Sequence, residues 1–526
     1  MEPGIVTDSQ SPRKPLLIVL VFFLAGTLAG LHVSANAHVL LVAAGVCLLS
    51  SLVFAFGGFR RSEVIALSRI LLLCGVALAA AANSRIRVER AAGGVTLPDD
   101  LPDTFTAPVR VTGTVAGDVR RVTGRRRTRY EFDLQIESVR GDLPVDLQPG
   151  VRMSVVDFSG MRHLPVAGER WNLAGRLTFG RFPAESGHVP RLILRRGGHR
   201  RLDTAAGSFT AGLLAARRTA AAMLALGIER HRQQVDVIHA LTLGYREGLH
   251  PDVVTLFRQT GTLHIFAISG LHVGIFSALL VFVLRALRIS RPYWFYYLVP
   301  LLCGYTYATG AAPSAVRACI MALLFHGAYA LGRSPDGLSA LAAAAMLILA
   351  VDPLQIRAIG FIYSFVVVAG LILMHAPLAH WLRLLWVRDP LAEEPAGWEK
   401  ALRGIWEYFV SLAALSLCAW LFSAPLTLFF FGRFIPLAVV SNLLVVPLAF
   451  MVVSAACLSI TLGTLLPIAA EVFNHAAMVL VTVMTAVLDL FAKVPAIYLQ
   501  RPQQSLLFVV SCYLLLVPAA LRIRKK

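Results

Sequence analysis

Long apolar segments recur along most of this 526-residue chain, and they restrict its fold more than any other feature. Hydrophobic residues make up 57% of the sequence and charged residues only 15%, whereas a soluble domain carries about 25% charge. A helix of about 20 apolar residues crosses the roughly 30 Å hydrocarbon core of a bilayer. The composition therefore predicts a polytopic α-helical membrane protein.

About twelve of these segments are expected to be transmembrane helices. Three precede residue 84, at 16–34, 38–57 and 64–82, and the first contains the small-xxx-small pattern Gly26-Thr-Leu-Ala-Gly30, which allows close helix contact. Nine more follow, at about 263–287, 293–311, 313–331, 337–351, 355–376, 406–431, 436–464, 470–492 and 504–522. Positive-inside counting places both termini in the cytoplasm and the region after the third helix outside.

The hydrophobic period changes between residues 105 and 203. Val109–Val115 and Tyr130–Ile136 alternate apolar and polar residues, which is typical of half-buried strands. Further short strands are expected at 151–156, 170–177 and 191–195. About five short strands without a long helix predict a small all-β, OB-like extracytoplasmic domain.

A basic hairpin is predicted between the first two strands, and it contains Arg125, Arg126, Arg127 and Arg129. Residues 105–203 hold 18 Arg, no Lys and 10 acidic residues, a net charge of +8. Such a surface could bind single-stranded DNA, with Tyr130 and Trp171 available to stack on bases. The alternative is a solubilising hairpin tip on an extracytoplasmic domain.

The net charge of the whole chain, +19, has three competing explanations. They are positive-inside loops, attraction to anionic lipid and attraction to nucleic acid. The seven cysteines lie in apolar segments without CxxC spacing, and neither HExxH nor HxHxDH occurs. No metal, cofactor or catalytic residue is therefore predicted.

Residues 260–276 carry polar side chains in apolar surroundings, among them His264, Ser269 and His272. Gly270 is a natural place for a helix to break, and broken helices at membrane depth line cavities or lie buried in protein. The histidines could line a pathway or contact phosphate, or they could be hydrogen-bonded packing residues. A Ser/His intramembrane hydrolase is a third hypothesis, although the GxSxG pattern is missing.

Two further groups of residues are candidates for a pathway. Thr309 precedes Pro313, which is expected to open a helix, so Ser314 and Arg317 would lie at a helix N-terminus that favours an anion. Arg317 could instead extend to the membrane interface. Asn442 could cross-link helices or line a pathway, because a buried amide must find partners.

Several motifs together resemble the ComEC-type competence channel family. They are Leu243-Gly244, Phe257–Gly261, the run His264-Ile-Phe-Ala-Ile-Ser-Gly-Leu-His272, Thr309-Gly310 with Ser314 and Arg317, Asp352-Pro353 with Gly360, and Ser441-Asn442 with Pro447. The resemblance covers residues 240–450. It implies a channel in the bacterial cytoplasmic membrane that passes one strand of transforming DNA.

The resemblance also implies partners. Many members continue into a C-terminal metallo-β-lactamase-like domain, whereas this sequence ends at Lys526 directly after its last apolar segment. A separate nuclease and a cytoplasmic motor are therefore expected, and a homodimer is an open alternative. A secondary transporter of a small or lipid-linked anion on the same scaffold remains the competing hypothesis.

The expected organisation has four parts. These are transmembrane helices over residues 1–83, an OB-like domain over 84–204, amphipathic and short helices at the membrane surface over 205–260, and the channel core over 261–526.

Overall fold

The computed structural model describes most of the chain. The residues outside its described ranges are 1–14, 33–35, 57–61, 94–103, 116–119, 124–127, 142–151, 158–164, 166–168, 181–190, 204–208, 247, 267–269, 310–311, 385–396, 495–498 and 526. The chain divides into two compact units. One contains residues 1–90 and 320–372, and the other contains 91–319 and 373–526.

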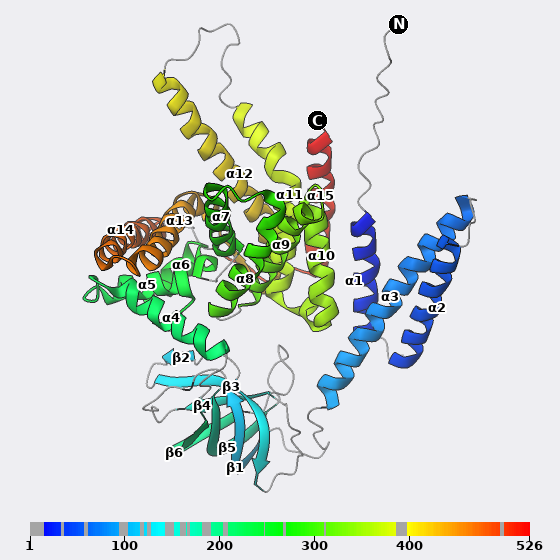
Figure 1. The fold of residues 1–526 in the computed structure, drawn as a ribbon, viewed down its shortest axis with the longest axis horizontal. Coiled ribbons are helices and arrows are strands. Elements are labelled where there is room, and N and C mark those ends of the chain that lie inside the picture. The colour runs from blue at the N-terminus through cyan, green and yellow to red at the C-terminus, as the bar shows by residue number, and fades with distance from the viewer. Residues whose placement is uncertain are drawn as a thin grey trace. The chain divides into compact units, whose positions relative to one another are not determined.

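Six described strands form the β-domain of the second unit (Figure 1). They are β1 (Thr104–Val115), β2 (Arg120–Thr123), β3 (Thr128–Arg140), β4 (Arg152–Asp157), β5 (Arg170–Gly180) and β6 (Arg191–Asp203). The sheet order is β1-β5-β6-β4-β3-β2, and β1 also pairs with β3, so the sheet closes on itself. Only the pairing of β4 with β6 is parallel among those described.

The inward side chains of these strands form a core of their own. Val111, Leu134, Met153, Leu173 and Leu192 are fully buried in it. They belong to five different strands, so alternation along each strand supplies one face of the core. The predicted strands are therefore present, and the basic hairpin corresponds to β2 and β3 with its tip outside the described residues.

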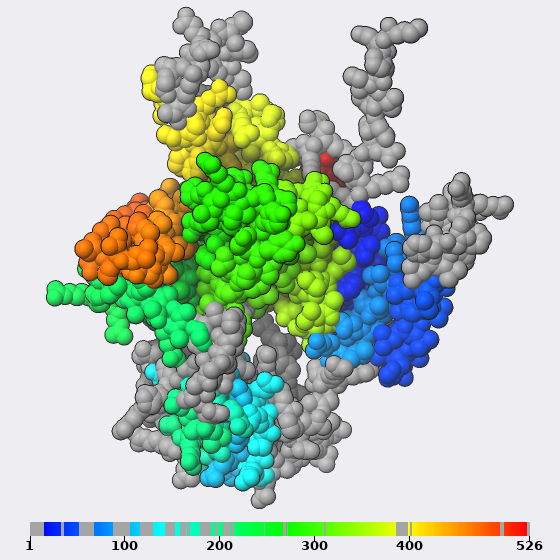
Figure 2. All heavy atoms as spheres, viewed as in Figure 1, coloured from blue at the N-terminus to red at the C-terminus, as the bar shows by residue number. Residues whose placement is uncertain are grey.

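The second unit also contains a group of packed helices, which include the darker green and orange segments on the face shown in Figure 2. Its elements are α4 (Phe209–Ala225), α5 (Arg232–Leu243), α6 (Pro251–Gln259), the 3-10 helix η1 (Leu263–Phe266), α7 (Gly270–Ala286), α8 (Arg291–Ala308), the start of α9 (Pro313–Ala330), the end of α11 (Ile359–Arg383), α12 (Gly397–Phe431), α13 (Ala438–Gly463), α14 (Pro467–Ala492) and α15 (Leu506–Lys525). A two-stranded ribbon joins β7 (Arg433–Phe434) to β8 (Leu499–Gln500). Buried side chains of α5, α6, η1, α13 and α14 form one apolar cluster.

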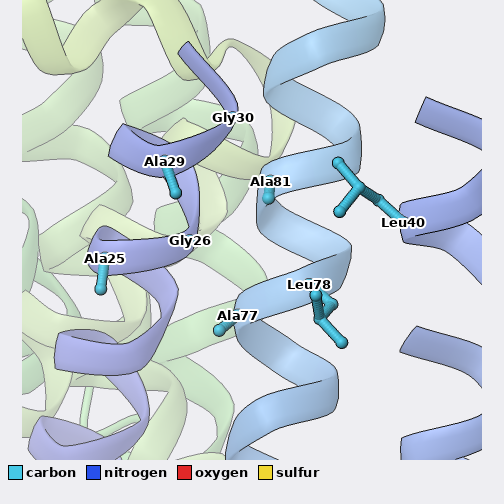
Figure 3. A pocket seen from close by; sticks show the side chains of 8 residues that line it. All are labelled: Ala25, Gly26, Ala29, Gly30, Leu40, Ala77, Leu78 and Ala81. Atoms are coloured by element: carbon cyan, nitrogen blue, oxygen red, sulfur yellow. The ribbon is translucent and has the colours of Figure 1, made fainter. Parts of the chain in front are cut away.

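The first unit holds α1 (Pro15–His32), α2 (Ala37–Phe56), most of α3 (Ser62–Gly93), the end of α9, α10 (Gly337–Val351), the 3-10 helix η2 (Pro353–Arg357) and the start of α11. Gly26 and Gly30 face Ala77 and Ala81 across the α1–α3 contact (Figure 3). A Cβ on either glycine would collide with the backbone carbonyl opposite. The small-xxx-small pattern of the sequence therefore lies at a close helix contact.

An apolar groove of about 310 Å³ follows this contact. It is lined by Ala25, Gly26, Ala29, Gly30, Leu40, Ala77, Leu78 and Ala81 (Figure 3). Elsewhere in the unit, the Asn83 amide and the Arg87 guanidinium donate to the carbonyls of Ala350 and Val351 at the end of α10. These bonds satisfy carbonyls that a helix C-terminus leaves without an intrahelical donor.

Among the described residues, six helices are long and apolar enough to cross a membrane. They are Pro15–His32, Ser68–Arg87, Ile359–Arg383, Leu402–Phe431, Ala438–Gly463 and Pro467–Ala492. Shorter apolar helices cover Ala37–Ser51, His272–Ala286, Gly337–Val351 and Leu506–Arg522. The chain is thus a polytopic helical membrane protein, as predicted, whereas the number of spans expected from the sequence stays a prediction.

Candidate functional site

The polar stretch 260–276 begins in a tight connection between α6 and η1. Thr260 and Thr262 are fully buried, and both hydroxyls hydrogen-bond the Phe257 carbonyl and each other. Gly261 between them has φ +75°, a left-handed conformation that favours glycine. The described chain then runs as a 3-10 helix to Phe266 and resumes as α7 at Gly270, with Ser269 outside the described residues. The interruption expected near Ser269 and Gly270 falls on residues outside the described part of the chain and stays a prediction.

Gly261 brings this stretch against α13. A Cβ at Gly261 would lie 2.8 Å from Cβ of Ala438 and 3.4 Å from Cγ2 of Ile435. Asn442 lies one turn after Ala438 in the same helix, and its Oδ1 is buried without a hydrogen-bond partner among the described residues. A second motif of the resemblance therefore lies next to the first.

The start of α7 lies beside the start of α9. A Cβ at Gly270 would meet Cβ of Ala318 at 3.7 Å, an ordinary contact. Arg317, the neighbouring residue, is buried with 4% of its surface exposed. The rings of Phe276 and Tyr305 stack at 4.5 Å, which adds α8 to the same group of helices.

Thr309 and Ser314 lie on either side of the connection from α8 to α9. The Thr309 hydroxyl is buried and donates to the carbonyls of Tyr305 and Thr306, so it closes the end of α8. Ser314 is half-buried in the first turn of α9, as expected from Pro313. These positions agree with a helix end facing a helix start, and they do not by themselves show an anion site.

The two histidines have different surroundings. His272 is buried, with 1% of its surface exposed, and its ring hydrogen-bonds the backbone of Leu241. The His264 ring is exposed and Nδ1 lies 3.2 Å from the Gly261 carbonyl oxygen. His272 is therefore buried and His264 exposed, and the two hypotheses for this pair, a pathway and hydrogen-bonded packing, stay predictions.

Two arginines that the sequence did not single out hold the connection after α5. The Arg217 guanidinium donates to the Leu243 carbonyl from both Nε and Nη2, at 3.2 and 2.7 Å. Its carbon lies 4.0 Å from the centroid of the Tyr245 ring, a cation–π contact. The Arg246 Nε donates to the Phe266 carbonyl at 2.7 Å, at the last residue of η1. Both bonds depend on carbonyls 20 or more residues away, so no local pattern could have indicated them.

Helix α5, beside this site, contains two side chains whose pKa values are shifted. Burial lowers the pKa of His239, whose Nε2 lies 2.8 Å from the Ala221 carbonyl oxygen. Desolvation raises the pKa of the Asp236 carboxyl one turn earlier. Both groups are therefore held nearer to their neutral forms, as partly buried groups without a close ion pair are.

Trp171 requires a correction. Its side chain is 3% exposed in the core of the β-domain, and Nε1 donates to Oε2 of Glu169 at 3.0 Å. Its ring therefore cannot stack on a base without unfolding the strand. The physical reason is alternation, because Trp171 shares the inward face of β5 with Leu173 and Leu177.

The remaining predicted DNA-binding residues lie on or near the β2–β3 hairpin. Tyr130 is half-buried and pairs with Arg121 and Asp157 on the neighbouring strands. Arg129 lies in β3, and Arg125, Arg126 and Arg127 fall outside the described residues. The described part of the chain contains no cluster of three potential metal ligands.

One charge pattern around the site was not predicted from the motifs. No Asp or Glu occurs between Asp252 and Asp336, although this stretch includes all of α6 after its first turn, η1, α7, α8 and α9. Its charged residues are Arg258, Arg285, Arg288, Arg291, Arg317 and Arg333. The chain between Asp252 and Asp336 thus carries only positive charge, whereas α5, which also contacts residues 260–276, holds Asp236. A charge count per segment would have shown this.

The fold and this site define a polytopic helical membrane protein in which α7, α8, α9 and α13 meet around residues 260–276. A family described as Competence protein matches residues 241–526, more than half of the sequence. The chain belongs to this family, the ComEC-type competence proteins.

Two curated relatives are each 30% identical over part of the chain. ComE operon protein 3 of Bacillus subtilis (strain 168) matches over 211 residues, which are 40% of this chain and 24% of that protein. Uncharacterized protein YcaI of Escherichia coli (strain K12) matches over 220 residues, 40% of this chain and 27% of that protein. The matched region thus spans about a quarter of each relative's length. No solved structure matches.

Proposed function

We propose that this protein forms a channel that takes up single-stranded DNA across the cytoplasmic membrane during natural transformation. The observation that carries the proposal is the match to the Competence family, because it begins at residue 241 and includes the stretch 260–276 together with α8, α9 and α13, which contact it. A polyanion can cross a bilayer only along a wet and preferably electropositive path. The absence of acidic residues between Asp252 and Asp336 supports such a path.

The pathway would pass the exposed His264, with Arg246 and Gly270 nearby. All three residues are exposed, and Arg246 and His264 have basic side chains. Thr309, Ser314, Arg317 and Asn442 would shape its wall from α8, α9 and α13. Ser269 is expected to belong to the same wall, as the resemblance implies.

We infer that the β-domain is an OB-like barrel on the extracytoplasmic side that receives the strand. The support is its closed order β1-β5-β6-β4-β3 with one parallel pair, together with its +8 charge from 105 to 203. Arg125, Arg126, Arg127, Arg129 and Tyr130 would contact the DNA, by phosphate attraction and base stacking. Both termini would be cytoplasmic.

The channel would pass one strand without itself hydrolysing DNA. A separate nuclease would then degrade the other strand, and a cytoplasmic motor would pull the transported one. A homodimer would place two such cores side by side. These partners follow from the proposed role and from the resemblance.

The proposal is tested by deleting the gene in a transformable host and following labelled DNA. Loss of label from the cytoplasm, with surface binding of duplex DNA retained, is the expected result. Unchanged uptake would refute the channel. Unchanged DNA uptake with lost accumulation of a small anion would favour the transporter hypothesis.

A second experiment addresses the hairpin in the full-length protein. Replacing Arg125, Arg126 and Arg127 by Gln should weaken single-stranded DNA binding and reduce the slope of log K against log salt by about 0.7 for each lost phosphate contact. A matched control removes three exposed arginines elsewhere, Arg288, Arg333 and Arg383. Equal losses in both variants would show a general charge effect and contradict a binding role for the hairpin.

A further inference from the structure

The α13–α14 hairpin carries an inference that is independent of DNA uptake. α13 and α14 are antiparallel neighbours joined at 464–466, and by length and composition each could cross a membrane. At the tip, Ser459 donates to Oδ1 of Asn474 at 2.7 Å, and Gly463 lies against Ala470. Three features of its surroundings disagree with a spanning hairpin.

The first feature is where the hairpin leaves α12. The uncharged part of α12, Tyr408–Phe431, is about 36 Å long. The Trp420 Nε1 donates to the Ile435 carbonyl and the Ser416 hydroxyl to the Val439 carbonyl, both at 2.9 Å. Ser416 is about 22 Å from the end of the helix, so α13 starts beside the middle of α12. In Figure 1 the hairpin then leaves α12 instead of following its N-terminal half.

The second feature is a polar layer along the hairpin. At the tip, the Asn474 amide donates to the carbonyls of Met223 and Leu226 at the end of α4. At the base, Gly261 abuts Ala438. The segment α4–α6 therefore follows the hairpin from tip to base, as Figures 1 and 2 also show.

The outer side of this layer is hydrophilic. Its exposed residues include Arg230, His231, Arg232, Gln233, Asp252, Thr255, Arg258 and Gln259. No large hydrophobic side chain is exposed among the described side chains of residues 212–262. This surface belongs in water or among headgroups, because charged groups at hydrocarbon depth are costly.

The third feature is an apolar stripe on the opposite side of α14. Its exposed members recur every four or seven residues, at Ile468, Val472, Val479, Val483 and Leu490. The buried members, Ala470, Asn474, Ala477, Val481, Met484 and Leu488, lie on the other face of the helix. At 100° per residue the two sets are about 180° apart. One side of α14 thus contacts the layer and core, and the other exposes the apolar stripe, with the exposed polar side chains of Glu471, His475, Thr482 and Asp489 along one edge of it.

We propose that the α13–α14 hairpin lies in the plane of the membrane within one leaflet. Its apolar stripe rests on lipid acyl chains, and α4–α6 cover it on the aqueous side. The dimensions agree, since a helix is about 10 Å wide and half of the hydrocarbon core is about 15 Å thick. A hairpin leaving α12 near mid-depth thus places the layer above it at the headgroups. Hydrocarbon is the partner that this stripe fits, because the same hairpin begins beside the middle of an apolar span.

The in-plane arrangement determines on which side of the membrane the hairpin tip lies. Arg501 lies at the C-terminal end of α12, since its backbone N–H donates to the Gly432 carbonyl at 2.9 Å. Arg403 lies near the other end of the same helix. Thr464 at the tip should share the side of Arg501, whereas a spanning hairpin would place it with Arg403.

Single cysteines at Thr464, Arg501 and Arg403, in a cysteine-free full-length protein, test this with an impermeant maleimide on membranes of both orientations. All three residues are exposed. T464C is expected to label together with R501C and from the face opposite to R403C. Labelling of T464C together with R403C would overturn the proposal.

A depth measurement provides a second test that does not depend on labelling. Nitroxides are attached one at a time at Val472, Val479 and Leu490, and their depths are determined in vesicles from collisions with oxygen and a nickel chelate. An in-plane helix gives nearly equal depths at the three positions. A spanning α14 would give depths that change by about 27 Å along the normal between residues 472 and 490, and this result would reject the in-plane hairpin whatever the DNA experiments show.

Discussion

The guanidinium carbon of Arg217 lies 4.0 Å from the ring centroid of Tyr245, and the same guanidinium donates two hydrogen bonds to the Leu243 carbonyl. Arg217 is 3% exposed. It thus joins α4 to the connection after α5, and the backbone of Leu241 just before that connection holds His272. A residue outside the resemblance thereby positions two of its motifs.

Arg217→Ala is expected to destabilise the protein by about 2–3 kcal/mol, because a charged donor to a buried carbonyl and a cation–π contact are both lost. Arg217→Lys should lose less, since an ammonium keeps the charge but not the forked geometry. Thermal unfolding in detergent measures the change. Arg218→Ala, at an exposed neighbour in the same helix, is the control and should change little. Equal effects at 217 and 218 would contradict the role assigned to Arg217.

Gly261→Ala is expected to cost about 1–2 kcal/mol for the left-handed conformation alone, and more because the new methyl would lie 2.8 Å from Cβ of Ala438. Gly274→Ala in α7 is the control, since no atom lies within 4 Å of its Cβ position. Unfolding of both variants is compared in detergent, and the same variants can be assayed for DNA uptake. A Gly261→Ala protein as stable as Gly274→Ala would show that this connection is not constrained.

Asn474→Ala is expected to destabilise the hairpin by about 2–3 kcal/mol, because the carbonyls of Met223 and Leu226 would lose buried donors. Thr482→Ala on the exposed side of the same helix should stay within about 0.5 kcal/mol of the parent. Hydrogen exchange of the α4 and α14 amides resolves the difference locally. Faster exchange confined to α14, without a change in α4, would argue against Asn474 as the link between them.

These residues show what could be predicted from the sequence. The apolar runs placed α7 to α15 close to their observed positions, because hydrophobic periodicity is a local property. Burial of Trp171 was also readable, since it alternates in phase with Leu173 and Leu177. The roles of Arg217 and Asn474 were not readable, because their partners are backbone carbonyls up to 251 residues away. Likewise, length and composition describe α13 and α14 as spans, and only their contacts with α12 and α4–α6 point elsewhere.

The stability of the β-domain is expected to depend on pH through the carboxyl group of Glu137. Hydrogen bonds from Arg170 and Thr114 lower the pKa of its carboxyl below the ordinary 4.5. The carboxylate therefore stabilises the folded state above its unfolded pKa, and this stabilisation is lost as the pH falls through the folded pKa. Both partners of the ion pair are over a third exposed, so Glu137→Gln should cost only about 0.5 kcal/mol at pH 7.

The measurement is amide exchange in β1, β3 and β5 at pH 7 and at acidic pH. The cost of Glu137→Gln should disappear at acidic pH, and it should also be small in an Arg170→Gln background. A cost that is equal at both pH values would mean that packing, not the carboxylate charge, explains the effect.

The last prediction concerns Gly26, which lies in the unit that contains α1 and most of α3. A Cβ at this position would collide with the Ala77 carbonyl, and one at Gly30 with the Ala81 carbonyl. Backbone atoms cannot turn aside as a flexible side chain can, so Gly26→Ala must separate the two helices and is expected to cost about 1–3 kcal/mol. Gly45→Ala in α2 is the matched control, because nothing lies within 4 Å of its Cβ position. Thermal unfolding in detergent compares the two variants. If Gly26→Ala unfolds at the temperature of Gly45→Ala, the α1–α3 contact is looser than described, and the apolar groove beside it would not depend on these glycines.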